Sequence, residues 1–127
     1  MINELKLEVM SSAYLDAIDF TDCSEDDPEM YNSLGFSSEL ISHAKKTCEK
    51  FLTIVGDKLP DSLASQAGHD LWLTRNGHGA GFWGRPEIYG EDFADYFTSL
   101  CHWRDGEFRE VYTYVGDDNL IYIMGGE

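Results

Sequence analysis

The chain has 127 residues, of which 43% are hydrophobic and 13% aromatic, which is enough for one domain with an apolar core and too short for two ordinary domains. Its 24 acidic and 9 basic residues give a formal net charge of −15. This charge opposes direct binding to nucleic acid and to anionic membranes, and it favours a basic protein partner. We therefore expect one domain over residues 1–127 that binds neither nucleic acid nor membrane directly.

The first ten residues, MINELKLEVM, lack the basic segment, apolar core and cleavage site of a signal peptide. No apolar run approaches the roughly 18 residues of a membrane span. Cys23, Cys48 and Cys101 are odd in number and widely spaced, which is typical of reduced thiols and not of a disulfide framework. We expect a cytoplasmic protein with buried, unreactive cysteines.

A helix is predicted over residues 3–20, because its apolar residues recur at spacings of three and four: Leu7, Met10, Tyr14, Ala17 and Ile18. Acidic side chains gather at its end and in the segment that follows, namely Asp16, Asp19, Asp22, Asp26 and Asp27. Carboxylates near a helix C-terminus oppose the helix dipole and cost stability. This acidic region is either a binding surface or a solvated face.

Residues 21–36 contain Pro28 and Gly35 and are predicted to be a loop. Ser37 or Ser38 can cap the next helix, which we expect to end at Gly56. Its apolar side is predicted to comprise Leu40, Ile41, Ala44, Cys48, Phe51, Leu52 and Val55. A shorter helical turn is predicted from Asp61 to Ala67, with Gly68 ending it.

The remainder is predicted to be mostly strand. Residues 69–75 and 79–83 flank Asn76-Gly77, the strongest short signal for a β-hairpin. A helix is predicted over 90–103, and a second hairpin pairs 109–115 with 120–124 across the turn GDDN. The order ααββαββ predicts an α+β domain in which two N-terminal helices and an intervening helix cover one antiparallel sheet of about four strands.

Within the first predicted hairpin, one face is apolar and ends in Arg75 and His78 at the tip. The other face places Trp72 and Trp83 above Gly79 and Gly81. Two interpretations remain open: the rings cover bare backbone inside a two-sided sheet, or they form an aromatic platform for a ligand or a protein.

Catalysis is not favoured, although the residue types are those of general acid–base catalysis: His69, Asp70, Arg75 and His78. On a strand, His69 would lie about 20 Å from the tip and Asp70 would point to the opposite face. Metal binding is not favoured either, because Cys101 and His102 are adjacent and Cys-x-x-Cys is missing. The Asp and Asn residues of GDDN are interpreted as turn-forming residues of a hairpin and not as metal ligands. No catalytic residue, metal or cofactor is predicted.

The stretch HDLWLTRNGHGAGFW, residues 69–83, follows Gln66-Ala67-Gly68 and precedes YVGDD at 114–118. It resembles a group of small, acidic, mostly uncharacterised proteins encoded by bacteriophages and related mobile elements. The likeness extends weakly to 13–17 and to Asp26-Asp27. After Trp83 the chain departs from the group's pattern, because Gly84 stands where an acidic residue usually precedes the arginine. The resemblance implies a bacterial host cytoplasm and carries over no catalytic residue.

Three functional hypotheses follow. The first is a non-enzymatic accessory protein that binds a host or phage protein, for example as an inhibitor that mimics nucleic acid in a basic groove. Its predicted binding residues are Asp16, Asp19, Asp22, Asp26, Asp27, Trp72, Arg75, His78 and Trp83. The second is a small ligand-binding or hydrolytic domain centred on His69, Arg75 and His78. The third is a homodimer formed through an open sheet edge.

Overall fold

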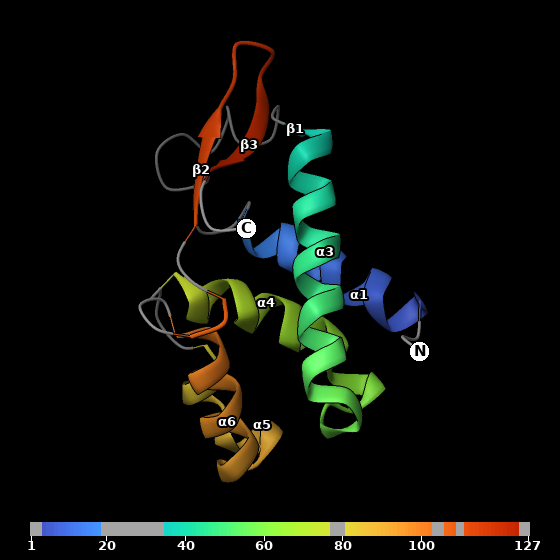
Figure 1. Ribbon diagram of the computed structural model, residues 1–127, viewed down its shortest axis with the longest axis vertical. Helices are drawn as coiled ribbons and strands as arrows, with labels where there is room; N and C mark the ends of the chain where they lie inside the picture. Colours follow the sequence, from blue (N-terminus) through green and yellow to red (C-terminus); the bar gives the residue numbers. More distant parts are fainter. Residues whose placement is uncertain (1–3, 19–34, 77–80, 103–105, 109–110, 125–127) are drawn as a thin grey trace.

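The computed structural model describes residues 4–18, 35–76, 81–102, 106–108 and 111–124, which form a mostly helical α+β fold (Figure 1). In Figure 1 the long helix α3 (Ser38–Val55) crosses α1 (Glu4–Ile18), and α1 packs along α4 (Ala64–Arg75). A small sheet lies at one end of the molecule, and the helices α5 (Pro86–Tyr89) and α6 (Glu91–Cys101) lie at the other. The predicted order ααββαββ with a four-stranded antiparallel sheet is wrong.

Two helices agree closely with the sequence prediction. The apolar stripe of α1 is buried as expected, from Leu7 to Ile18. Helix α3 begins after Ser37, whose Oγ accepts the Leu40 N–H at 3.1 Å, and it is followed by Gly56 with φ 54°. Its predicted apolar side is buried except for Ile41, which is 49% exposed. Local capping chemistry thus set both ends of α3.

The largest error concerns residues 64–75, which form the helix α4 and not a strand. Most of this helix is buried, including Gly68, Asp70, Leu71 and Trp72, so it lacks the polar face that distinguishes a surface helix from a strand. Asn76 caps its end: the side chain donates to the Trp72 carbonyl at 3.1 Å and accepts the Val111 N–H at 3.0 Å. Asn76 thus caps a helix where a hairpin turn was predicted, and Gly77 lies outside the described ranges.

Of the second predicted strand, residues 79–80 lie outside the described ranges, and Phe82 and Trp83 belong to the short 3₁₀ helix η4 (Phe82–Gly84) instead. Two further 3₁₀ turns, η2 (Gly56–Lys58) and η3 (Asp61–Leu63), connect α3 to α4. Helix α6 confirms the helix predicted over 90–103, and Phe97 and Cys101 are buried on its inner side.

The second predicted hairpin is confirmed as β2 (Tyr112–Val115) and β3 (Leu120–Met124), which pair antiparallel with Tyr114 opposite Tyr122. The two-residue strand β1 (Gly35–Phe36), at the end of the predicted loop, pairs parallel to β3. Asp118 accepts the Leu120 N–H at 3.1 Å and the Tyr122 hydroxyl at 2.6 Å. The GDDN segment is therefore a hairpin turn, as predicted.

An aromatic cluster joins α3 to the C-terminal half of the chain. Phe51 stacks on Phe82 with ring centroids 5.6 Å apart, and Phe97 contacts both rings edge-on at 5.5 and 5.3 Å. Phe108 packs against Phe51 at 5.9 Å. These buried rings hold η4 and α6 against α3.

Candidate functional site

The structure separates the residues predicted for binding. Trp72 and Arg75 lie on α4 and are fully buried, whereas Trp83 in η4 is 58% exposed. Trp72 packs edge-on against Tyr14, with centroids 5.4 Å apart. Trp72 and Trp83 therefore do not form one aromatic platform, and the alternative of Trp72 covering glycines inside a sheet is also wrong, because Trp72 lies on a helix. Asp16 is exposed on α1, and the other predicted binding residues lie outside the described ranges: Asp19, Asp22, Asp26, Asp27 and His78.

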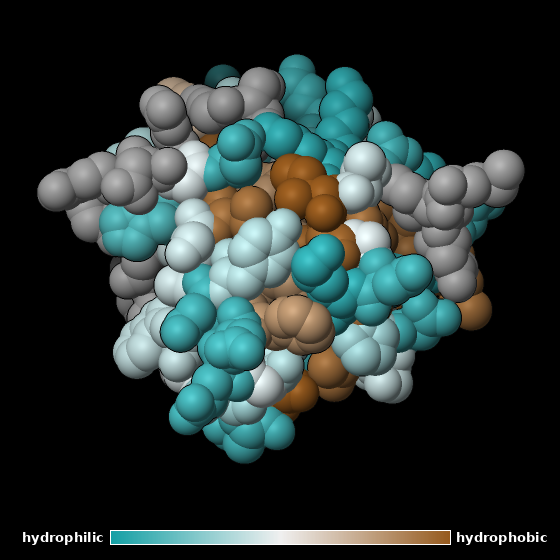
Figure 2. Space-filling model, turned by 60° about the horizontal axis from the view of Figure 1, so that its bottom comes forward, coloured by the Kyte–Doolittle hydropathy of each residue, from teal (hydrophilic) through white to brown (hydrophobic). Residues whose placement is uncertain are grey.

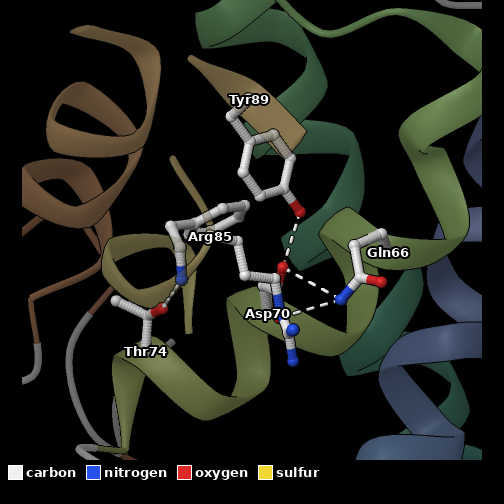
Figure 3. A network of polar contacts seen from close by, with 6 residues as sticks. Gln66, Asp70, Thr74, Arg85 and Tyr89 are labelled. Atoms are coloured by element: carbon white, nitrogen blue, oxygen red, sulfur yellow. Dashed lines mark hydrogen bonds and ion pairs between the residues drawn. The ribbon is translucent and has the colours of Figure 1, made fainter. Parts of the chain in front are cut away.

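Asp70 is the centre of a buried polar network that joins α4 to η4 and α5 (Figure 3). Its carboxylate accepts hydrogen bonds from Arg85 Nε at 2.9 Å, from the Tyr89 hydroxyl at 2.6 Å and from Gln66 Nε2 at 3.1 Å. Burial and then the hydrogen bond to Asp70 raise the pKa of Tyr89, and the same carboxylate raises the pKa of Arg85. The Asp70 carboxylate thus connects α4 to the residues that follow it, and it is not exposed to solvent.

Thr74, one turn after Asp70 on α4, connects this helix to residues 81–82. Its Oγ1 accepts the Phe82 N–H at 3.0 Å, which Figure 3 also shows. A Cβ placed on Gly81 would come within 1.9 Å of the same oxygen, so this close approach requires glycine. Much of the unusual composition of residues 69–83 is therefore explained by folding contacts.

A second polar chain crosses the interior from Arg75 to His43. Arg75 Nη1 donates to the Tyr14 hydroxyl at 3.1 Å, and the hydroxyl lies 2.9 Å from His43 Nε2. Burial first, and then the positive charge of Arg75, lower the pKa of His43 to about 4. His43 is therefore neutral at pH 7, with one ring nitrogen carrying the proton and the other able to accept a hydrogen bond.

His43 also lines a pocket between α3 and β3 with a volume of about 580 Å³, which is within the range of small-molecule sites. We call it the α3–β3 pocket; its lining residues are Ser38, Glu39, Ser42, His43, Lys46, Thr47 and Ile123. His43 and Thr47 are buried at its base, and the other residues from α3 are exposed around it. Sequence reasoning missed this pocket, because it forms only when Ile123 of β3 lies beside α3; the one local signal was two polar residues, His43 and Thr47, inside an apolar stripe.

A smaller hollow of about 190 Å³ lies between α1 and α4 and brings Asp16 beside His69. Gln66, which bonds to Asp70, also lines it. The sequence predicted both Asp16 and His69 as residues of interest but placed them in unrelated elements. Helix α4 brings them together because it packs along α1.

The helices α5 and α6 pack on η4 and form an end of the molecule that carries exposed aromatic and acidic side chains. We call residues 82–101 the α5–α6 end. Trp83 is 58% exposed and Phe93 is 39% exposed. The exposed acidic residues are Glu87, Glu91, Asp92 and Asp95. Figure 2 shows apolar side chains open to solvent among hydrophilic ones on the face at this end.

The two cysteines in the described ranges lie in the apolar core. Cys48 and Cys101 are buried, and burial raises the pKa of both thiols. Cys23 lies outside the described ranges. Within those same ranges, the structure has no group of three His, Cys, Asp or Glu side chains that could hold a metal ion.

No helix among the described residues combines the length and the apolar character needed to cross a membrane. Comparison of the chain with protein-family models, with curated proteins and with solved structures finds no significant match. The functional argument therefore rests on the chain's own surfaces.

Proposed function

We propose that this protein acts by non-enzymatic binding to a protein partner with a basic surface, and that the α5–α6 end is the contact surface. The observation that carries this proposal is the exposure of Trp83 and Phe93 on a segment rich in acidic residues. Large exposed aromatic side chains are the residues that most often dominate binding energy in protein interfaces. The surrounding carboxylates select the charge of the partner.

The charge of this end is not balanced within the segment. Residues 82–101 contain one basic residue, Arg85, and its Nε is bonded to the buried Asp70. Glu87, Glu91 and the neighbouring acids are therefore available to a partner. The net charge of −15 adds long-range attraction toward a basic protein and repels nucleic acid.

A natural target for such a surface is the basic groove of a nucleic-acid-binding protein, which the acidic helices would occupy in place of phosphates. This version of the proposal agrees with the bacteriophage setting that the resemblance of residues 69–83 implies. It places the protein in the cytoplasm of a bacterial host as an accessory or inhibitory factor.

The alternative of a ligand-binding or hydrolytic centre at His69, Arg75 and His78 has less support. Arg75 is fully buried, with Tyr14 and the Phe108 ring as neighbours, and it lines none of the hollows described above. His69 faces a different hollow, beside Asp16. Dimerisation through a sheet edge stays a prediction.

The test compares two variants that have the same net charge. The first carries Glu87→Gln, Glu91→Gln, Asp92→Asn and Asp95→Asn at the α5–α6 end. The control carries Glu4→Gln, Glu8→Gln, Glu49→Gln and Asp57→Asn on α1, α3 and η2, where all four residues are exposed. Each protein is used to capture proteins from a bacterial lysate, and each captured protein is purified and its affinity is measured over a salt series.

We expect the control to retain the wild-type affinity for a basic captured protein and the α5–α6 variant to lose at least about tenfold, with a weaker dependence on salt. Trp83→Ala should lower the affinity by about tenfold without changing the salt dependence. Equal losses in the two charge variants would show that net charge alone attracts the partner and would refute the proposed surface.

A further inference from the structure

We propose that the α3–β3 pocket is a binding site for a short peptide, about three residues long, with free amino and carboxyl ends. The lining residues belong to the first half of α3 and to β3, and Figure 1 shows these segments toward the sheet end of the molecule, away from α5 and α6. The inference is therefore independent of the proposed partner surface.

Two opposite charges mark the pocket. Glu39 and Lys46 both line it and are seven residues apart on α3. At a rise of 1.5 Å per residue, their backbones are separated by about 10.5 Å along the helix axis. An extended peptide of three residues spans about 10 Å. Its ammonium group can thus pair with Glu39 while its carboxylate pairs with Lys46.

Polar groups between these charges suit the peptide backbone. Ser42 lies on the same face of α3, and His43 and Thr47 are buried at the base of the pocket. Because the Tyr14 hydroxyl lies 2.9 Å from His43 Nε2, the other ring nitrogen, Nδ1, faces a ligand: it donates to a peptide carbonyl in one tautomer and accepts a peptide N–H in the other. Tyr14 is held in turn by Arg75, so the ring is fixed before a ligand arrives.

The charge pattern distinguishes this ligand from a simple anion. Among the described residues that line the pocket, Lys46 is the only one with a cationic side chain, and Glu39 would repel a phosphate or a free carboxylate. A zwitterion satisfies both charges. Ile123 from β3 supplies an apolar contact for one of its side chains.

Titration of the full chain with trialanine tests the site, with two-dimensional NMR to follow the amide signals. We expect the signals of Ser42, His43 and Thr47 to shift. N-acetyl-trialanine and trialanine amide should each bind about fivefold more weakly, the size of one exposed ion pair. In Lys46→Met, amidation of the carboxyl end should no longer weaken binding, whereas acetylation of the amino end still should. In Glu39→Gln, acetylation should no longer weaken binding, whereas amidation still should.

Neighbouring residues on α3 provide matched controls. Lys45→Met and Glu49→Gln make the same charge changes, but their side chains line a separate hollow beside Glu4 and Glu8. Both controls should keep the wild-type preference for free ends.

Three results would each overturn the inference: signals of the pocket that do not move at millimolar trialanine, capped and uncapped peptides that bind equally, or inorganic phosphate that binds as tightly as trialanine. None of these results depends on the α5–α6 end. A failure here would leave the proposed partner surface standing, and the reverse also holds.

Discussion

Asp70 is a fully buried carboxylate whose hydration is replaced by Arg85, Tyr89 and Gln66. A buried charge is costly unless several donors surround it, and it becomes strongly destabilising when one partner is removed. The residue thus locks α4 to η4 and α5 only while the whole network is intact. Its position on a helix also explains why an acidic residue stands in the middle of an apolar segment.

We predict that Asp70→Asn lowers the free energy of unfolding by about 2–3 kcal/mol, because the asparagine amide would face donors and Arg85 would lose its counter-charge. This expected loss of stability is smaller than for a fully buried ion pair, because the side chain of Arg85 is 30% exposed. Asp61→Asn is the matched control, since Asp61 pairs with Lys6 at 3.2 Å but is 74% exposed. It should cost at most about 1 kcal/mol. Urea denaturation measures both values, and equal costs would refute the role of Asp70.

His43 should make stability depend on pH. Its folded pKa of about 4 lies below the ordinary value of 6.5, so between these values the unfolded chain binds a proton that the folded chain does not. Stability is then complete above about pH 6.5 and falls as the pH drops toward 4. The loss from this residue approaches about 3 kcal/mol, at 1.4 kcal/mol per pKa unit.

Urea denaturation of the wild type and of His43→Gln between pH 7 and pH 4 tests this prediction. Glutamine can still accept the Tyr14 hydroxyl but does not titrate. The two proteins share every other titratable group, so the difference between their stabilities isolates residue 43. The stability difference between the proteins should narrow or reverse as the pH falls. Parallel curves would contradict the lowered pKa of His43.

At the scale of elements, α4 organises the molecule through its contact with α1. Gly68 lies where the two helices cross, and a Cβ at this position would come within 2.1 Å of the Met10 carbonyl oxygen. The glycine that was predicted to end a helical turn therefore sits inside a helix. It allows the backbones to approach each other more closely than any side chain would permit.

Gly68→Ala should therefore lower the free energy of unfolding by about 1–3 kcal/mol through overpacking. The sign is informative, because the same change in an unobstructed helix stabilises by about 1 kcal/mol. Ser65→Ala, at an exposed position on α4, should stay within about 0.5 kcal/mol of the wild type. Thermal or urea unfolding distinguishes these outcomes. A stabilised Gly68→Ala protein would show that α1 and α4 do not cross so closely.

The elements that were predicted correctly share one property, which is that their signals are local. Ser37 and Gly56 bracket α3 within one turn of each end, and the GDDN turn closes on Tyr122 four residues after Asp118. In α4 the same local reasoning failed. Leu71 and Leu73 alternate as in a strand, and Asn76-Gly77 has the composition of a hairpin turn.

At the scale of the whole molecule, two surfaces lie toward different ends. The α5–α6 end combines Trp83 and Phe93 with uncompensated acidic residues, and the α3–β3 pocket pairs Glu39 with Lys46. Of these, the sequence predicted Trp83 alone as a binding residue. The pocket could not be predicted, because it needs Ile123 of β3 to lie beside α3, some 75 residues away in the chain.

By itself, the sequence determined the acidic charge, the buried stripe of α1, both ends of α3, the helix α6 and the hairpin of β2 and β3, since each depends on contacts within a few residues. Only the tertiary structure decided that residues 64–75 are a helix. Burial against α1 and η4 removes the polar face from which a helix is recognised. The same packing turned Asp70, Trp72 and Arg75 inward and left Trp83 at the surface.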